Sequence, residues 1–130
     1  MEKKRTLLLV GHSKTYLSAL TEVMERLATK MDVYPLLQKE KIDWQNYSLV
    51  LVDISMIAAY LDLIRWIRDK HPSGRIVVIS PDPGWKQARA VLLAGAADYI
   101  RRSDDVNYLT GILQRYNQDP EVEAETGGDL

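Results

Sequence analysis

The residues best placed to do chemistry in this 130-residue sequence stand at the ends of apolar runs. Asp53 ends the run SLVLVD, Ser80 ends RIVVIS, and Arg102 comes two residues after ADYI. The first apolar run, RTLLLV, is followed by Gly11 and His12. A guanidinium is permanently charged and can bind a carboxylate through two parallel hydrogen bonds, so an ion pair on Asp53 is one chemistry that this set allows.

These runs belong to a regular alternation of strand-like and helix-like segments. Short apolar, β-branched runs are typical of buried strands, and we expect strands over 5–10, 32–37, 48–53, 75–80 and 97–100. Apolar residues at helical spacing predict helices after an N-cap at Ser13, over 56–70, over 85–94, and from near Ser103 onward. Pro35 suits a strand at the sheet edge, and the stretch after that strand has room for only two helical turns.

Strict alternation of strands and helices predicts an α/β fold, a three-layer α/β/α sandwich with five parallel strands. Right-handed crossovers and short loops favour the flavodoxin-like strand order 2-1-3-4-5. In that order the winding direction reverses between the first and third strands, and ligands bind beyond the carboxyl ends of the strands at this point. We therefore expect Gly11, His12 and Asp53 to border a pocket, with Ser80 and Arg102 on the neighbouring strands.

The composition excludes several classes of protein. The apolar fraction of 46% and the charged fraction of 27% are typical of a soluble globular domain. The chain has no cysteine, which excludes disulfides and thiolate chemistry and agrees with a reducing compartment. No apolar segment approaches the length of a membrane span, and the first run is too short for the core of a signal peptide. We therefore expect a cytoplasmic protein without membrane contact.

Charge is unevenly distributed along the chain. Residues 118–130 contain five acidic residues and no basic one, whereas the preceding residues carry 17 bases and 13 acids, a net charge of +4. That bias is too small to indicate nucleic-acid binding. The composition of 118–130 is typical of a disordered tail or a linker, so we expect one domain over 1–117 followed by this acidic segment.

Three motifs resemble the receiver domain of two-component response regulators, over roughly residues 5–116. LVDISM is similar to the motif of the family's third strand, in which the aspartate accepts a phosphoryl group; here that aspartate is Asp53. Ser80 stands at the family's hydroxyl position on the fourth strand, and AGAADYI places Tyr99 at its switch aromatic. The resemblance implies a receiver fold and a role in phosphorelay signal transduction with a protein partner.

The chain departs from the family's pattern around this site. The two adjacent acids that hold magnesium in the family correspond to Gly11 and His12. The family's lysine after the fifth strand corresponds to Arg102, and the proline after it to Ser103. The turn after Asp53 lacks the family's proline and glycine. These departures predict a degenerate receiver site.

The departures bear directly on the chemistry. Phosphoryl transfer to a carboxylate brings two negative groups together, and a divalent cation normally offsets that repulsion. Magnesium prefers several oxygen ligands, and imidazole is a poor one. Asp53 alone would bind the ion weakly, so we expect weak or absent magnesium binding and no cofactor. We hypothesise that Arg102, with or without His12, neutralises Asp53 directly and holds the pocket in one state.

Other roles stay open for each of these residues. Asp53 could be a pocket residue that is now structural, a helix-capping acid or a live phosphoacceptor. His12 could be a hydrogen-bonded loop residue or a metal ligand, although no second histidine or cysteine is spaced to help it. Ser80 could satisfy a backbone group at the strand end. Tyr99 could be core packing instead of a moving switch.

A second group of residues could form a partner surface. Trp85 leads the helix after the PDPG loop, where it could anchor a partner or cover the sheet end; we expect the second. Arg89 and Arg101 could share the surface of the helix predicted over 85–94 and the fifth strand, which in receiver domains carries output contacts, or could form a plain solvated face. Receiver-like domains also pair through their fourth and fifth helices, so a homodimer through 85–94 and the last helix is possible.

Three functions compete on these grounds. The first, which we favour, is a degenerate receiver that acts as a protein–protein interaction module, with magnesium-dependent phosphorylation lost or weakened; its partner would be a histidine kinase or an output protein. The second is a working receiver that takes a phosphoryl group from a histidine kinase on Asp53. The third, a small enzyme or nucleotide binder, is disfavoured because GHSKT has a single glycine and no nucleophile–base pair is evident. We therefore expect no enzymatic activity.

Overall fold

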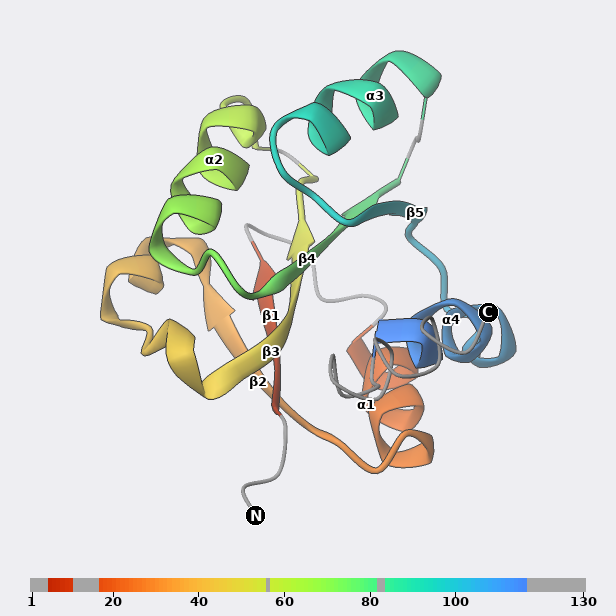
Figure 1. The fold of residues 1–130 in the computed structure, drawn as a ribbon. Coiled ribbons are helices and arrows are strands. Elements are labelled where there is room, and N and C mark those ends of the chain that lie inside the picture. Colours follow the sequence, from red (N-terminus) through yellow and green to blue (C-terminus); the bar gives the residue numbers. More distant parts are fainter. Residues whose placement is uncertain (1–4, 11–16, 56, 82–83, 117–130) are drawn as a thin grey trace, which may run out of the picture.

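The computed structural model describes residues 5–10, 17–55, 57–81 and 84–116, and its centre is one parallel sheet (Figure 1). The strands are β1 (Arg5–Val10), β2 (Lys30–Pro35), β3 (Tyr47–Asp53), β4 (Arg75–Ser80) and β5 (Asp98–Arg101). They pair in parallel in the order β2-β1-β3-β4-β5, which confirms the predicted order. Gly11, His12, the N-cap expected at Ser13, and 118–130 lie outside the described residues.

The second strand differs most from its expected bounds. The sequence predicted 32–37, whereas β2 ends at Pro35 and the next residue begins a 3₁₀ helix. Proline has no backbone N–H to donate and its ring fixes φ, so Pro35 is a natural end for a strand. β2 lies at the edge of the sheet, as Pro35 led us to expect, and the missing donor therefore removes no central ladder bond.

Four α-helices accompany the described strands: α1 (Leu17–Arg26), α2 (Tyr60–Lys70), α3 (Trp85–Leu93) and α4 (Val106–Leu113). The start predicted for α2, residue 56, is wrong by four residues. The cause is a turn directly after β3, in which the carbonyl of Ile54 accepts a hydrogen bond from the backbone N–H of Ile57 at 3.1 Å.

The start predicted for α4, near Ser103, is also too early. Asp105 is the N-cap of α4, and its carboxylate accepts hydrogen bonds from the backbone N–H groups of Asn107 and Tyr108. A capping side chain satisfies donors that the first helical turn leaves without partners, so the helix begins immediately after Asp105. Ser103 instead accepts a hydrogen bond from the backbone N–H of Asp105 at 3.0 Å and closes the turn before the helix.

The connection between β2 and β3 is short, as expected, and contains no α-helix. It forms two 3₁₀ helices, η1 (Leu36–Lys41) and η2 (Trp44–Asn46). Trp44 is 6% exposed, and its ring meets that of Trp66 edge-on with the centroids 5.9 Å apart. Large aromatic surfaces therefore fill the space that a longer helix would cover. A third 3₁₀ helix, η3 (Gln114–Tyr116), follows α4 directly.

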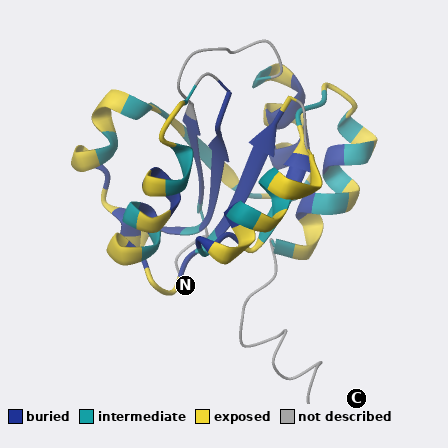
Figure 2. Ribbon diagram, turned by 90° about the horizontal axis from the view of Figure 1, so that it is seen from above, coloured by how far each residue is buried: buried dark blue, intermediate teal, exposed yellow. Residues whose placement is uncertain are grey.

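Helices lie on both faces of the sheet, which confirms the three-layer fold (Figures 1 and 2). Buried apolar side chains fill the space between the helices and each face of the sheet. One face is covered by α2 and α3, whose buried residues are Leu63, Ile64, Ile67 and Val91. The other face is covered by α1 and α4, whose buried residues include Leu20, Met24, Leu109 and Leu113. With both faces of the sheet dry, polar chemistry is confined to the ends of the strands.

Candidate functional site

Asp53 ends β3 and is buried, with 1% of its surface exposed. Its Oδ1 atom accepts two hydrogen bonds from Ser55, one from the backbone N–H at 2.9 Å and one from the hydroxyl at 2.5 Å. A carboxylate in a dry environment is stable as an ion only where hydrogen bonds and opposite charge replace its water. Ser55 supplies the hydrogen bonds to one of the two oxygens.

Arg102 supplies the opposite charge. Its backbone N–H donates to the carbonyl of Ser80 at 2.8 Å, which anchors the residue beside the end of β4. Its Nη2 atom lies 3.6 Å from Oδ2 of Asp53 and also donates a hydrogen bond to the hydroxyl of Ser55. A separation of 3.6 Å is typical of an ion pair and too long for a hydrogen bond. Asp53, Ser55 and Arg102 therefore form one cluster across the ends of β3 and β5.

Ser55 has a role that the sequence reasoning missed. A signal for it was present, because short polar side chains two residues from an aspartate often bond to it in tight turns. Asp53 and Ser55 have this spacing, and the turn after β3 brings the backbone and the hydroxyl of Ser55 onto the same carboxylate oxygen.

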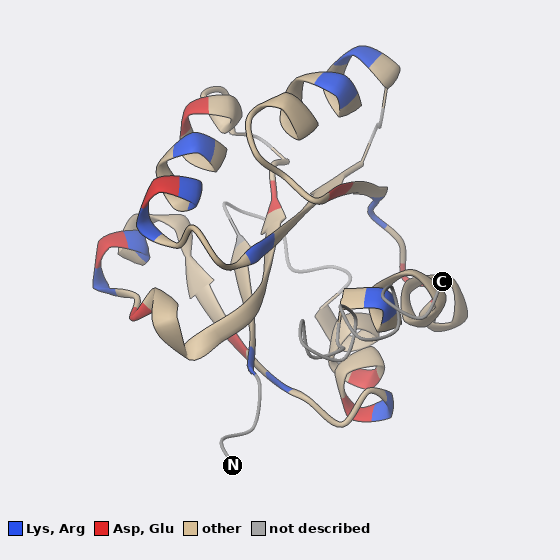
Figure 3. Cartoon of the chain, viewed as in Figure 1, with Lys and Arg blue, Asp and Glu red and all other residues tan. Residues whose placement is uncertain are grey.

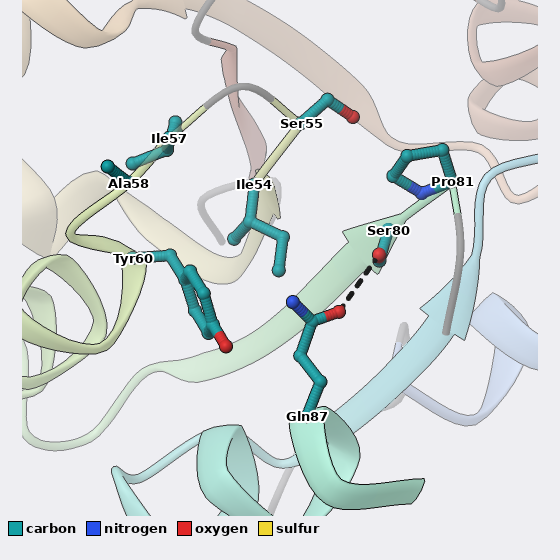
Figure 4. Close-up of a pocket in the computed structure, with 8 residues that line it drawn as sticks. All are labelled: Ile54, Ser55, Ile57, Ala58, Tyr60, Ser80, Pro81 and Gln87. Carbon is teal, nitrogen blue, oxygen red and sulfur yellow. Dashed lines mark hydrogen bonds between the residues drawn. The ribbon is translucent and has the colours of Figure 1, made fainter. Parts of the chain in front are cut away.

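Ser80 and Tyr99 meet on a residue that the sequence did not single out. The hydroxyl of Ser80 donates to Oε1 of Gln87 at 3.1 Å, and the hydroxyl of Tyr99 donates to the same oxygen. Figure 4 shows Gln87 reaching from α3 toward the end of β4, beside a pocket of about 500 Å³ that Ser55 and Tyr60 also line. Gln87 thus connects α3 with the ends of β4 and β5.

The described residues do not fit a magnesium site. The two oxygens of Asp53 contact Ser55 and Arg102, and no group of three or more His, Asp or Glu side chains within the described ranges could hold a metal ion. A fixed guanidinium beside the carboxylate also repels a divalent cation. Weak or absent magnesium binding stays a prediction, because Gly11 and His12 lie outside the described part of the chain.

The outer side of α3 is exposed, basic and apolar. Trp85 is 72% exposed, so the expectation that it covers the sheet end is wrong. Helical periodicity explains its position, because Trp85 shares a helix side with Arg89 and Leu92, whereas Val91 points to the core. Arg89 and Arg101 are exposed as well. Figure 3 shows basic and no acidic residues along α3.

No protein-family model matches the chain. In solved structures, however, its fold is that of response regulator receiver domains. A response regulator from Thermotoga maritima matches with a TM-score of 0.76 and 22% identity, over 89% of this chain and 99% of that chain. HP1043, an orphan response regulator of H. pylori, matches with a TM-score of 0.74 and 21% identity, over 91% of this chain and 100% of that chain. The predicted receiver fold is therefore confirmed.

One curated protein is similar in sequence. The photosynthetic apparatus regulatory protein RegA of Rhodobacter capsulatus is 27% identical over an alignment of 112 residues, which covers 84% of this chain. The chain spans 61% of the length of that relative.

None of the helices in the described part of the chain combines the length and the apolar character that crossing a membrane would need.

Proposed function

We propose that the chain is a receiver domain of two-component signalling that works as a protein–protein interaction module, with Asp53 neutralised by its own neighbours. The observation that carries this proposal is the ion pair between Arg102 and Asp53, joined by the two hydrogen bonds from Ser55. The receiver fold and the similarity to RegA support the signalling role. The proposal assigns the chain no catalytic activity of its own.

The physical basis of the proposal is charge balance. A phosphoryl group carries negative charge and approaches a carboxylate only where cations offset the repulsion. Arg102 carries its charge at any physiological pH, and the charge that it offers is already matched by Asp53. A pocket balanced in this way has one favoured state, so the partner surface would be presented without a phosphorylation signal.

Beryllofluoride with magnesium tests whether the pocket is silent. Added together to the ¹⁵N-labelled chain, they should leave the amide resonances of Asp53, Ser55 and Ser80 unchanged, because Arg102 already occupies the charge-balancing position. Asp53→Asn is the matched control, since shifts that persist in it arise from magnesium bound elsewhere. Saturable shifts around Asp53 that disappear in Asp53→Asn would overturn the proposal.

The alternative is a working phosphoacceptor that takes its phosphoryl group from a histidine kinase on Asp53. One observation favours it: a pocket of about 500 Å³ is lined by Ser80 and by Ser55, whose hydroxyl donates to the carboxylate of Asp53. This alternative requires the intact chain to gain the mass of one phosphoryl group when incubated with acetyl phosphate and magnesium. The gain must also be absent from Asp53→Asn.

The exposed side of α3, together with Arg101, is the partner surface in this proposal. Trp85 is 72% exposed and Leu93 is 77% exposed, with Arg89 between them, so the surface combines apolar anchors with positive charge. Tryptophan and arginine are the residue types that most often dominate binding energy at interfaces. A partner that presents apolar and acidic side chains would complement this surface.

Substitutions on this surface test the interaction. Trp85→Ala and Arg89→Glu should each weaken recovery of a partner on the immobilised chain, whereas circular dichroism should report an unchanged fold because both side chains are exposed. Leu37→Ala and Lys41→Glu are matched controls, since both residues are exposed on η1, beside the other edge of the sheet. Equal recovery from all four variants would exclude this surface.

Two further expectations belong to the same proposal. The first is a homodimer through α3 and α4. Such a dimer would place Lys86 and Arg89 of the two copies on one interface, where like charges repel. Sedimentation of the wild type at low and high salt tests for this dimer, since screening of the like charges would favour it.

A cytoplasmic location is the second expectation, and fractionation of cells that produce the chain would test it.

A further inference from the structure

A groove of about 410 Å³ lies between β5 and α4. Tyr99, Tyr108 and Ile112 give it an aromatic and apolar lining, and Arg101 and Arg115 give it positive charge. β5 is the edge strand of the described sheet, with β4 as its one neighbour, so the groove runs along an edge that no further described strand covers. A free strand edge beside a hydrophobic lining is a site for an added segment of chain.

The positive charge of the groove lacks a described counterpart. Arg101 and Arg115 are exposed, and no carboxylate among the described residues lies within ion-pairing distance of either. The guanidinium of Arg101 lies over the ring of Tyr108, 5.5 Å from its centroid, which holds it at the groove. Asp98 also lines the groove, but its carboxylate accepts hydrogen bonds from the backbone N–H of Tyr99 and the hydroxyl of Tyr116.

The chain itself carries the complementary chemistry next to this groove. The described part ends at Tyr116, whose hydroxyl donates to Oδ2 of Asp98 in β5 at 2.8 Å. The following segment, 118–130, contains five acidic residues and no basic one. Within it, Glu121, Glu123 and Glu125 alternate with Val122 and Ala124. Alternation of this kind places carboxylates on one side of an extended chain and small apolar groups on the other.

We propose that the acidic segment 119–125 docks in cis into the groove between β5 and α4, with its glutamates toward Arg101 and Arg115. The reach is sufficient, because nine residues from 117 can span up to roughly 30 Å, whereas the four residues of β5 cover about 13 Å. The short tether also keeps the effective concentration of the segment near the millimolar range, so weak contacts suffice.

If the acidic segment docks in this groove, it competes with a partner for Arg101. Arg101 belongs both to this groove and to the partner surface proposed above, so a docked segment would cover part of that surface. This consequence, though not the docking itself, rests on the proposed function. An acidic partner would then have to displace the segment before it reached Arg101, and its affinity would rise when the glutamates were neutralised.

A single nitroxide label tests the docking. The chain has no cysteine, so Ala124→Cys provides the one thiol for labelling. In the full-length chain we expect stronger line broadening of the amide resonances of β5 and α4 than of those of β2 and η1. Arg101→Gln with Arg115→Gln should lower the docked-to-free ratio by roughly threefold to tenfold, since each exposed ion pair contributes modestly. Addition of about 0.5 M NaCl should act in the same direction.

Matched controls distinguish docking in cis from a solvated tail and from contacts between copies. Lys30→Gln with Lys41→Gln removes the same charge from exposed positions beside the far edge of the sheet and should leave the broadening unchanged. Broadening that is uniform, or equal in the Arg101→Gln, Arg115→Gln variant, would show a solvated tail and overturn the proposal. Broadening of a ¹⁵N chain without the nitroxide, when it is mixed with a spin-labelled chain, would show docking between copies and overturn it too. No phosphodonor or partner is used, so failure here leaves the proposed function untouched.

Discussion

At the scale of single residues, the decisive feature is how the buried carboxylate of Asp53 is satisfied. Removing a carboxylate from water costs several kcal/mol unless hydrogen bonds and opposite charge replace the solvent. Ser55 provides two hydrogen bonds to Oδ1, and Arg102 lies 3.6 Å from Oδ2. Arg102 is itself largely buried, with 20% of its side chain exposed, so solvent screens this pair only weakly.

Arg102→Gln should therefore destabilise the fold. We expect a loss of about 1–3 kcal/mol in the free energy of unfolding, because a buried charge loses its counter-charge. In an Asp53→Asn background the same substitution should cost much less, since no carboxylate then needs a cation. Urea unfolding of the wild type, the two single variants and the double variant measures the coupling between Arg102 and Asp53. Purely additive losses of unfolding free energy would contradict the ion pair.

At the scale of elements, the turn from α3 into β5 depends on a glycine and on one arginine of α2. Gly95 has a φ of 120°, a backbone conformation that residues with a side chain rarely adopt. Arg68 donates hydrogen bonds to the carbonyls of Pro72 and Gly74 before β4 and to that of Gly95 before β5. Arg68 therefore links the end of α2 to the start of two strands. This is the amino end of the strands, whereas the candidate site lies at their carboxyl ends.

Two glycine substitutions test this interpretation with opposite signs. Gly95→Ala should lower stability by about 1–2 kcal/mol through backbone strain, and its new Cβ would lie 3.2 Å from Cγ of Arg68. Gly111→Ala, in the middle of α4 where an added Cβ meets open space, should raise stability by about 0.5–1 kcal/mol. Thermal unfolding measures both changes in stability, and two changes of the same sign would contradict these different roles of Gly95 and Gly111.

At the scale of the whole molecule, a tyrosine–aspartate hydrogen bond lies toward each edge of the sheet. The hydroxyl of Tyr47 in β3 donates to Asp32 of β2 at 2.7 Å, and that of Tyr116 in η3 donates to Asp98 of β5 at 2.8 Å. Burial, and after it the neighbouring carboxylate, raises the pKa of both phenols above the ordinary value of 10.0. The folded chain thus holds these two protons more tightly than the unfolded chain does.

The raised pKa values predict a loss of stability in alkali. The contribution of the two phenols is fully present below about pH 10 and is lost as the pH rises above that value, because only the unfolded chain then releases the protons easily. Urea midpoints measured from about pH 9 to 11 should fall less steeply in Tyr47→Phe with Tyr116→Phe than in the wild type. Equal slopes in the two chains would contradict the raised pKa values.

The fold was largely predictable because its signals are local. Apolar runs located all five strands, and Pro35 indicated the edge position of β2. Boundaries that depend on a cap or a turn were less predictable. The start of α4 depends on which of several polar residues caps it, and Asp105 does so. The start of α2 depends on a turn after β3 that propensity does not encode.

The sequence by itself determined a parallel sheet covered on both faces. It also determined that Asp53, Ser80 and Arg102 come together at the carboxyl ends of the strands, because periodicity and strand alternation are properties of the chain alone. Only the tertiary structure decided that Ser55 donates hydrogen bonds to Asp53, that Gln87 joins Ser80 to Tyr99, and that Trp85 faces solvent. Those outcomes depend on the path of a turn and the rotational phase of a helix, and packing between distant segments sets both.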